Sequence, residues 1–228
     1  MTLLLDSVRA WCWLLHKDLL REWRAPRGWS GMLLLAVVLA ALIEMQLELP
    51  RELKRGLVAG LFWLAAFFAG TLALERSFAA ERECGCWSAL LLYPVAPGTI
   101  FLAKLTANFL ALCLVDAVLV AAFTIFSDVP LLTRPAAFAG ILLVANLGFA
   151  SVGTLLGALT SGIQQRGSLL VLLLLPLVSP VILSAAQATR LLLADSPGDW
   201  QRWAQLLAVF AVVFVSLGTL VFEFLTED

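Results

Sequence analysis

The chain has 228 residues, of which 62% are hydrophobic and only 14% are charged. Ordinary soluble domains contain roughly 45–50% apolar and about 25% charged residues. This composition excludes a water-soluble single domain and predicts that most of the surface faces lipid. The net charge is −1, from 15 Lys and Arg against 16 Asp and Glu, so no nucleic-acid partner is expected.

Six apolar stretches follow one another along the chain, and each has about the 20 residues that a helix needs to cross a bilayer. Their approximate ranges are 28–47, 56–74, 105–126, 136–160, 169–193 and 203–225. Helices are expected because unpaired backbone groups are very costly in hydrocarbon. The sequence therefore predicts an all-α membrane protein with six transmembrane helices and both termini on one side.

The distribution of Lys and Arg predicts the orientation, because cytoplasmic loops are enriched in positive charge. Nine basic residues fall on the side of the termini: Arg9, Lys17, Arg21, Arg24, Arg27, Arg76, Arg82, Lys104 and Arg166. Six fall on the other side: Arg51, Lys54, Arg55, Arg134, Arg190 and Arg202. We therefore expect an inner (plasma) membrane protein of a bacterium with both termini in the cytoplasm.

Residues 1–27 form a separate amphipathic segment ahead of the six-helix region at 28–228. On a helical projection the apolar face holds Leu4, Leu5, Val8, Trp11, Cys12, Leu15, Leu19 and Trp23. The opposite face holds Arg9, His16, Lys17, Arg21 and Arg24. This pattern predicts a helix in the membrane interface, with Trp and basic side chains as depth anchors. An amphipathic helix packed on a soluble partner is the alternative.

The chain shows no sign of its own catalytic or cofactor site. It has no Ser/His/Asp set, no HExxH and no P-loop, so we expect it not to be an enzyme, and ATP hydrolysis would need a partner subunit. Cys12, Cys84, Cys86 and Cys113 have neither zinc nor haem-attachment spacing. His16 lies among charged residues, which favours a solvated histidine over a haem ligand. We therefore expect no metal or cofactor to be bound directly.

A few polar residues interrupt the apolar stretches. Asp116 lies in the middle of the third stretch, two turns from Asn108. An ionisable residue there indicates a function, unless it is protonated or hydrogen-bonded to a neighbouring helix. Asn146, Gln187 and Glu223 are expected to join helices to one another.

Small residues and prolines predict local features of two helices. In the fifth stretch, Pro176 and Pro180 predict a kink. In the fourth stretch, a series of small residues would let another helix approach closely, either within the bundle or between subunits. The series is Gly148, Ser151, Gly153, Gly157 and Ala158.

The longest predicted cytoplasmic loop, 75–104, joins the second and third stretches. It begins with a charged turn, continues through Gly85 and a short apolar segment at 87–92, and reaches Pro94. A short helix held against the membrane there would offer a surface to a soluble partner. A re-entrant or interfacial loop with a structural role is the alternative.

Two blocks of the sequence carry a family resemblance. The first, in the loop and its flanks, contains Leu74, Glu75, Arg76, Phe78, Glu83, Gly85, Leu90-Leu91-Leu92, Pro94 and Lys104. The second block, 153–185, contains Arg166-Gly167 and the Leu175-Pro176-Leu177 pattern with Pro180. With these residues the chain resembles the CcmB haem exporter family, whose members are permease subunits of the cytochrome c maturation system. The resemblance covers nearly the whole chain.

The resemblance implies an ABC exporter-type (ABC-2-like) permease with an N-terminal elbow helix and a cytoplasmic coupling helix between spans two and three. The implied partners are an ABC ATPase dimer that hydrolyses ATP, a haem-handling membrane protein, a haem chaperone and a second permease copy. Haem is the implied cargo, and ATP hydrolysis would drive haem export or release of haem-loaded chaperone. The implied ATPase-coupling residues are Glu75, Arg76, Phe78, Glu83, Gly85 and Pro94.

Two other functions fit the sequence. One is a permease subunit of another ABC exporter, for a drug, lipid or polysaccharide. The other is a non-transporting membrane scaffold.

Overall fold

The computed structural model describes residues 2–24, 26–45, 50–83, 95–127, 129, 131–159, 167–194 and 199–224. Almost all of these residues are helical, which confirms the all-α prediction. The elements are α1 (Thr2–Arg24), α2 (Pro26–Met45), α3 (Arg51–Glu83), α5 (Pro97–Phe126), the short 3₁₀ helix η1 (Leu131–Thr133), α6 (Pro135–Leu159), α7 (Gly167–Leu193) and α8 (Trp200–Phe224).

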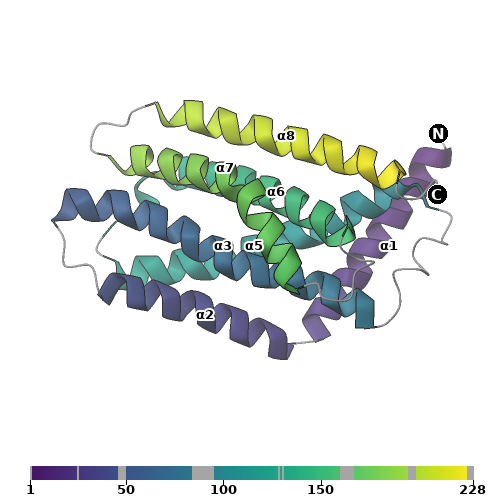
Figure 1. Ribbon diagram of the computed structural model, residues 1–228, viewed down its shortest axis with the longest axis horizontal. Coiled ribbons are helices and arrows are strands. Elements are labelled where there is room, and N and C mark those ends of the chain that lie inside the picture. The colour runs from purple at the N-terminus through teal and green to yellow at the C-terminus, as the bar shows by residue number, and fades with distance from the viewer. Residues whose placement is uncertain are drawn as a thin grey trace.

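The long helices form a bundle (Figure 1). Helices α2, α3, α5, α6, α7 and α8 lie side by side, and helices that follow one another in the chain run in opposite directions. Helix α1 is steeply inclined to them at one end of the bundle, where it contacts α5. The start of α1 and the end of α8 both lie at this end, as expected for a chain whose termini share one side.

Five helices in the described ranges are long and apolar enough to cross a membrane, so this is a multi-pass membrane protein. The apolar segments are Leu53–Glu75, Pro97–Phe126, Pro135–Leu159, Leu172–Leu193 and Trp200–Phe224. They correspond to the last five predicted stretches. The first predicted stretch corresponds to α2, in which the described apolar segment is the shorter Leu33–Leu42.

The prediction of a loop over 75–104 is wrong at both ends. Helix α3 continues to Glu83, and α5 already begins at Pro97. Residues 79–83 are alanine, glutamate and arginine, which favour a helix, so the charged segment extends α3 instead of turning. Pro97 suits the first helical turn, where its missing N–H has no intrahelical partner to lose.

The small residues of α6 pack against other helices of the same bundle. The sequence had left open whether they make this contact or one between subunits. All five of them are buried. A Cβ at Gly153 would overlap the Leu74 side chain of α3, and one at Gly148 would lie 3.4 Å from Cγ2 of Val181 in α7. Close helix approach at small residues is the usual packing mode within membranes. The series therefore brings α6 close to α3 and α7.

Helix α7 contains both predicted prolines and is bent (Figure 1). Pro180 has no N–H to donate to the carbonyl oxygen of Pro176 four residues earlier. The Ser179 hydroxyl donates to that oxygen instead, at 2.8 Å. Such side-chain donors are one reason why proline is tolerated within membrane helices.

We predict that Gly153→Val destabilises the protein by about 1–3 kcal/mol, because the added side chain overpacks against Leu74. The matched control on the same helix is Gly140→Val, since a Cβ at Gly140 meets nothing within 4 Å. The midpoint of thermal unfolding in detergent should fall clearly for the first variant alone. An equal fall in both variants would assign the effect to helix propensity and contradict the packing argument.

Candidate functional site

Three polar side chains form a buried stripe along α5. Lys104, Asn108 and Asp116 are only 4%, 2% and 2% exposed. Their spacings of four and eight residues place them on neighbouring parts of one helix face. Asn108 and Asp116 were candidates from the sequence, whereas the assignment of Lys104 to a loop is wrong. Lys104 lies in the third turn of α5 and points into the protein, where it pairs with Asp18.

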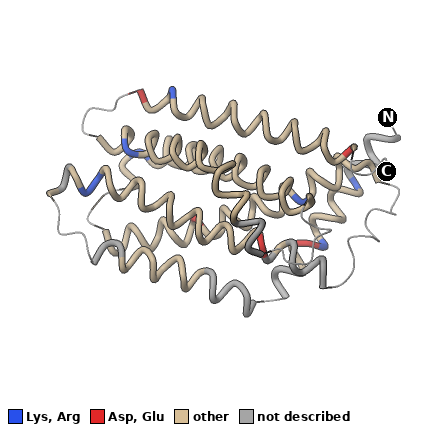
Figure 2. Tube along the Cα trace, in the orientation of Figure 1, with Lys and Arg blue, Asp and Glu red and all other residues tan. Residues whose placement is uncertain are grey.

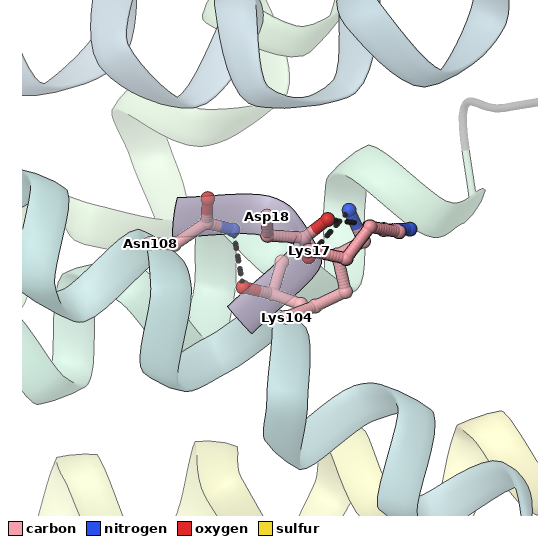
Figure 3. Close-up of polar contacts among 5 residues, drawn as sticks. Lys17, Asp18, Lys104 and Asn108 are labelled. Carbon is pink, nitrogen blue, oxygen red and sulfur yellow. Dashed lines mark hydrogen bonds and ion pairs between the residues drawn. The ribbon is translucent and has the colours of Figure 1, made fainter. Parts of the chain in front are cut away.

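The N-terminal end of the polar stripe is joined to α1 by an ion pair (Figure 3). Lys104 Nζ lies 3.1 Å from Asp18 Oδ2, and Lys17 Nζ lies 3.3 Å from Asp18 Oδ1. The side chains of Lys104 and Asp18 are only 5% and 10% exposed. Taking such charges out of water costs several kcal/mol per ion, which close pairing offsets. The pair therefore fixes where α1 lies against α5.

Asp18 was not among the residues predicted from the sequence, although the helical projection contains a signal for it. Asp18 lies seven residues after Trp11 and four after Leu14, so it shares a helix face with them. Both of these residues are partly buried, and Leu14 packs against the core. An acidic residue on an apolar face indicates a buried partner, and here that partner is Lys104.

The face of α1 that packs on the bundle overlaps only in part with the predicted apolar face. Trp11 and Leu15 are partly buried, whereas Cys12 is exposed and Leu19 is 41% exposed. The predicted polar residues Arg9, His16 and Lys17 are exposed. The contact of α1 with α5 includes the Asp18 pair with Lys104 as well as apolar side chains such as Leu14.

The polar stripe is joined to α6 in the bundle interior. Asn108 Nδ2 donates to Thr154 Oγ1 of α6 at 2.9 Å, and both side chains are buried (Figure 3). Asn108 therefore pairs across helices and not with Asp116 along its own helix. Further along, Asn146 of α6 lies beside Asp116 and donates to Cys113 Sγ at 3.6 Å. No protein group in the described ranges donates to the buried Oδ2 atom of Asp116.

Other polar residues of the apolar helices make different contacts. The prediction that Asn146 joins helices agrees with its bond to Cys113. Gln187 accepts a hydrogen bond from Arg190 Nε on the same helix at 3.0 Å, and Glu223 is exposed near the end of α8. A contact that the sequence did not indicate joins α3 to α7, where Trp63 Nε1 donates to Thr189 Oγ1 at 2.9 Å.

The structure describes only some of the candidate ATPase-coupling residues. Glu75, Arg76, Phe78 and Glu83 all lie in the last part of α3, at the end of the bundle near α1. Of these four, Glu75 is the residue whose side chain is described, and it is partly buried. Gly85 and Pro94 lie outside the described residues, as do Cys84 and Cys86. Among the described residues, no group of three or more His, Cys, Asp or Glu could hold a metal ion.

Figure 2 shows the charged residues gathered mostly near the ends of the helices, with long uncharged lengths between them. Together with the apolar helices and their interior polar contacts, this distribution defines a multi-pass α-helical membrane protein. The model of the CcmB protein family matches residues 9–224. The chain therefore belongs to the CcmB family, and the resemblance noted from the sequence is confirmed.

Three relatives extend this assignment, and each is named heme exporter protein B. The relative from Pseudomonas aeruginosa is 28% identical over 82% of this chain and 83% of its own length. Those from Rhodobacter capsulatus and Paracoccus denitrificans are 30% and 27% identical, each over 78% of this chain and 81% of their own. No solved structure matches the chain.

We predict that Lys104→Met destabilises the protein strongly, because it leaves the buried Asp18 carboxylate with only the more exposed Lys17. Breaking a buried pair typically costs about 3–5 kcal/mol. Lys17→Met is the control, since Lys17 is 45% exposed and its pair should contribute at most about 1 kcal/mol.

The double variant Asp18→Leu with Lys104→Met should recover most of the stability, because an apolar pair can replace a buried ion pair at little cost. Thermal unfolding in detergent measures all three variants. If the double variant were as unstable as the sum of its single changes, the two side chains would not be coupled.

Proposed function

We propose that this protein is the permease subunit of an ATP-driven ABC complex that serves cytochrome c maturation. The observation that carries the proposal is the CcmB family match over residues 9–224. The name shared by the three relatives, heme exporter protein B, supports haem as the cargo. The complex would use ATP hydrolysis for haem export or for release of a haem-loaded chaperone.

In this proposal α2 also crosses the membrane, which brings the number of spans to six. Helix α1 is the elbow helix of an ABC exporter-type permease. The packing of α2 alongside α3 and α5 in the bundle supports the first assignment (Figure 1). The inclined position of α1 at one end of the bundle supports the second. The excess of basic residues at that end favours the cytoplasm of the inner membrane for both termini.

The ATPase subunits would act on the end of α3 and the segment that leads to α5. Helix α3 is continuous from Arg51 to Glu83, so displacement of its last turns would tilt its membrane-spanning part as one rod. Helix α5 would move with α1, because Lys104 and Asp18 join them. The coupling residues in this mechanism are those implied by the resemblance, from Glu75 to Pro94.

The sequence supports the proposed division of chemistry between the subunits. This chain has no P-loop, so ATP would be bound and hydrolysed by the partner ATPase dimer. The haem-handling membrane protein, the haem chaperone and a second permease copy complete the proposed assembly. The contribution of this chain is mechanical, since it links the ATPase to the membrane-spanning bundle.

The direct test is a pull-down from detergent-solubilised membranes, followed by ATPase measurements with and without haem-loaded chaperone. Recovery of an ATPase and a haem-handling membrane protein, with a rate that responds to the chaperone, supports the proposal. Recovery of an ATPase without that response favours a permease for another cargo. Recovery of neither favours a scaffold.

We predict that Glu75→Arg uncouples ATP hydrolysis from cytochrome c maturation while membrane insertion stays intact. Glu75 lies on the last part of α3, where reversal of charge would disturb the ATPase contact. Asp199→Arg is the matched control, because Asp199 is exposed at the start of α8, at the opposite end of the bundle.

Maturation should fall at least tenfold for Glu75→Arg and stay near the wild-type level for Asp199→Arg, measured as covalently bound haem in c-type cytochromes. Gly85→Leu should act like Glu75→Arg, because it removes the freedom for a tight turn in the coupling segment. Normal maturation in both Glu75→Arg and Gly85→Leu would contradict the assigned coupling segment.

A further inference from the structure

Two buried acidic residues contribute to the polar contacts of α5, and their surroundings differ sharply. Asp18 has two ammonium groups within 3.3 Å, one from Lys17 and one from Lys104. Asp116 forms no ion pair among the described residues, although it is only 2% exposed. Its Oδ2 atom accepts no hydrogen bond from a described protein group.

The neighbours of Asp116 on α3 can be identified from contacts on either side of it. Helix α3 passes α5 in the opposite direction: the Phe62 ring lies 5.5 Å from that of Phe123, and a Cβ at Gly70 would lie 2.7 Å from Leu112. Asp116 lies between these two levels. The facing part of α3, residues 56–74, contains no charged residue and no histidine.

The apolar segments of the other long helices that pack against α5 contain no charged residue either. Helix α6 has no ionisable residue between Pro135 and Leu159, and neither does the apolar segment Leu33–Leu42 of α2. Helix α8 has none from 203 to 222, and the described contact of α1 with a charge on α5 is at Lys104, three turns away. The titratable group near Asp116 is Cys113, whose Sγ atom accepts from Asn146.

An ionised carboxylate in these surroundings would be far more costly than a neutral acid. Burial of an isolated charge in a medium of low dielectric is very costly, and buried groups avoid that cost by neutralising. Asn146 can contribute a hydrogen bond but no positive charge. A proton is the ligand that removes the charge without requiring space or a cationic neighbour.

We propose that Asp116 is a proton-binding site in the interior of the bundle, closed by the packing of α5 against α6. The ligand is a proton on the side-chain carboxyl, held in a dry environment beside Asn146. Because water must reach the carboxyl before the proton can leave, the proton is released or exchanged only when these two helices separate. This inference does not depend on the cargo or on the ATPase.

Infrared difference spectroscopy of the purified protein in lipid nanodiscs at neutral pH tests the site. A protonated carboxylic acid has a carbonyl stretch well separated from the two stretches of a carboxylate. The wild-type spectrum minus that of Asp116→Asn should contain the acid band. The wild-type spectrum minus that of Asp18→Asn should contain carboxylate bands instead, because Asp18 is paired with lysine.

Labelling of the aspartate side-chain carboxyls with the heavy carbon isotope makes the test independent of any variant. The acid band of the wild-type protein should shift on labelling, which assigns it to aspartate even if Asp116→Asn fails to fold. An aspartate spectrum with carboxylate bands alone, or an acid band that persists in Asp116→Asn, would overturn the proposal.

Transfer into heavy water then tests whether the site is closed. Exchange of the proton for deuterium shifts the acid band. The rate of this shift should be at least tenfold lower than the exchange rate of exposed backbone amides. A shift complete within the mixing time would show that water has free access, and would overturn a site closed by α5 and α6.

Discussion

The interior of a membrane protein offers no water to polar groups, and the structure depends on how this chain meets that constraint. Each polar group in the bundle needs a partner within the protein, because an unpaired one is costly in hydrocarbon. The partners come from neighbouring helices: Asp18 binds Lys104, and Asn108 binds Thr154. These contacts join helices far apart in the sequence, so the pairing of polar groups also determines which helices lie together.

Helix α5 is central to this arrangement. It contacts α1, α2, α3, α6 and α8, and it contributes Lys104, Asn108 and Asp116 to the interior. Apolar packing alone would leave a membrane helix free to rotate or slide, because lipid tails solvate its side chains as well as another helix does. The polar stripe removes that freedom, because only one rotation of α5 satisfies its partners on α1 and α6.

The sequence predicted the helices better than the contacts between them. The apolar stretches marked five spans closely, because helix length and hydropathy are properties of a continuous segment. The small residues of α6 were found from the same kind of local pattern, but only the structure placed Gly153 against Leu74 and Gly148 against Val181.

The Asp18 and Lys104 pair was missed for a physical reason. Lys104 follows Pro97 closely in the sequence and resembles a loop residue, whereas its burial depends on an acid 86 positions earlier, on a helix outside the bundle's main direction. The helical projection of α1 indicates that Asp18 has a buried partner, but no local pattern identifies that partner as Lys104. The same pair shows how the proposed mechanism would operate, since it joins the start of α5 to α1 while Asn108 joins its middle to α6. A displacement of α5 at its N-terminal end would therefore be transmitted to α1 through Lys104 and to α6 through Asn108.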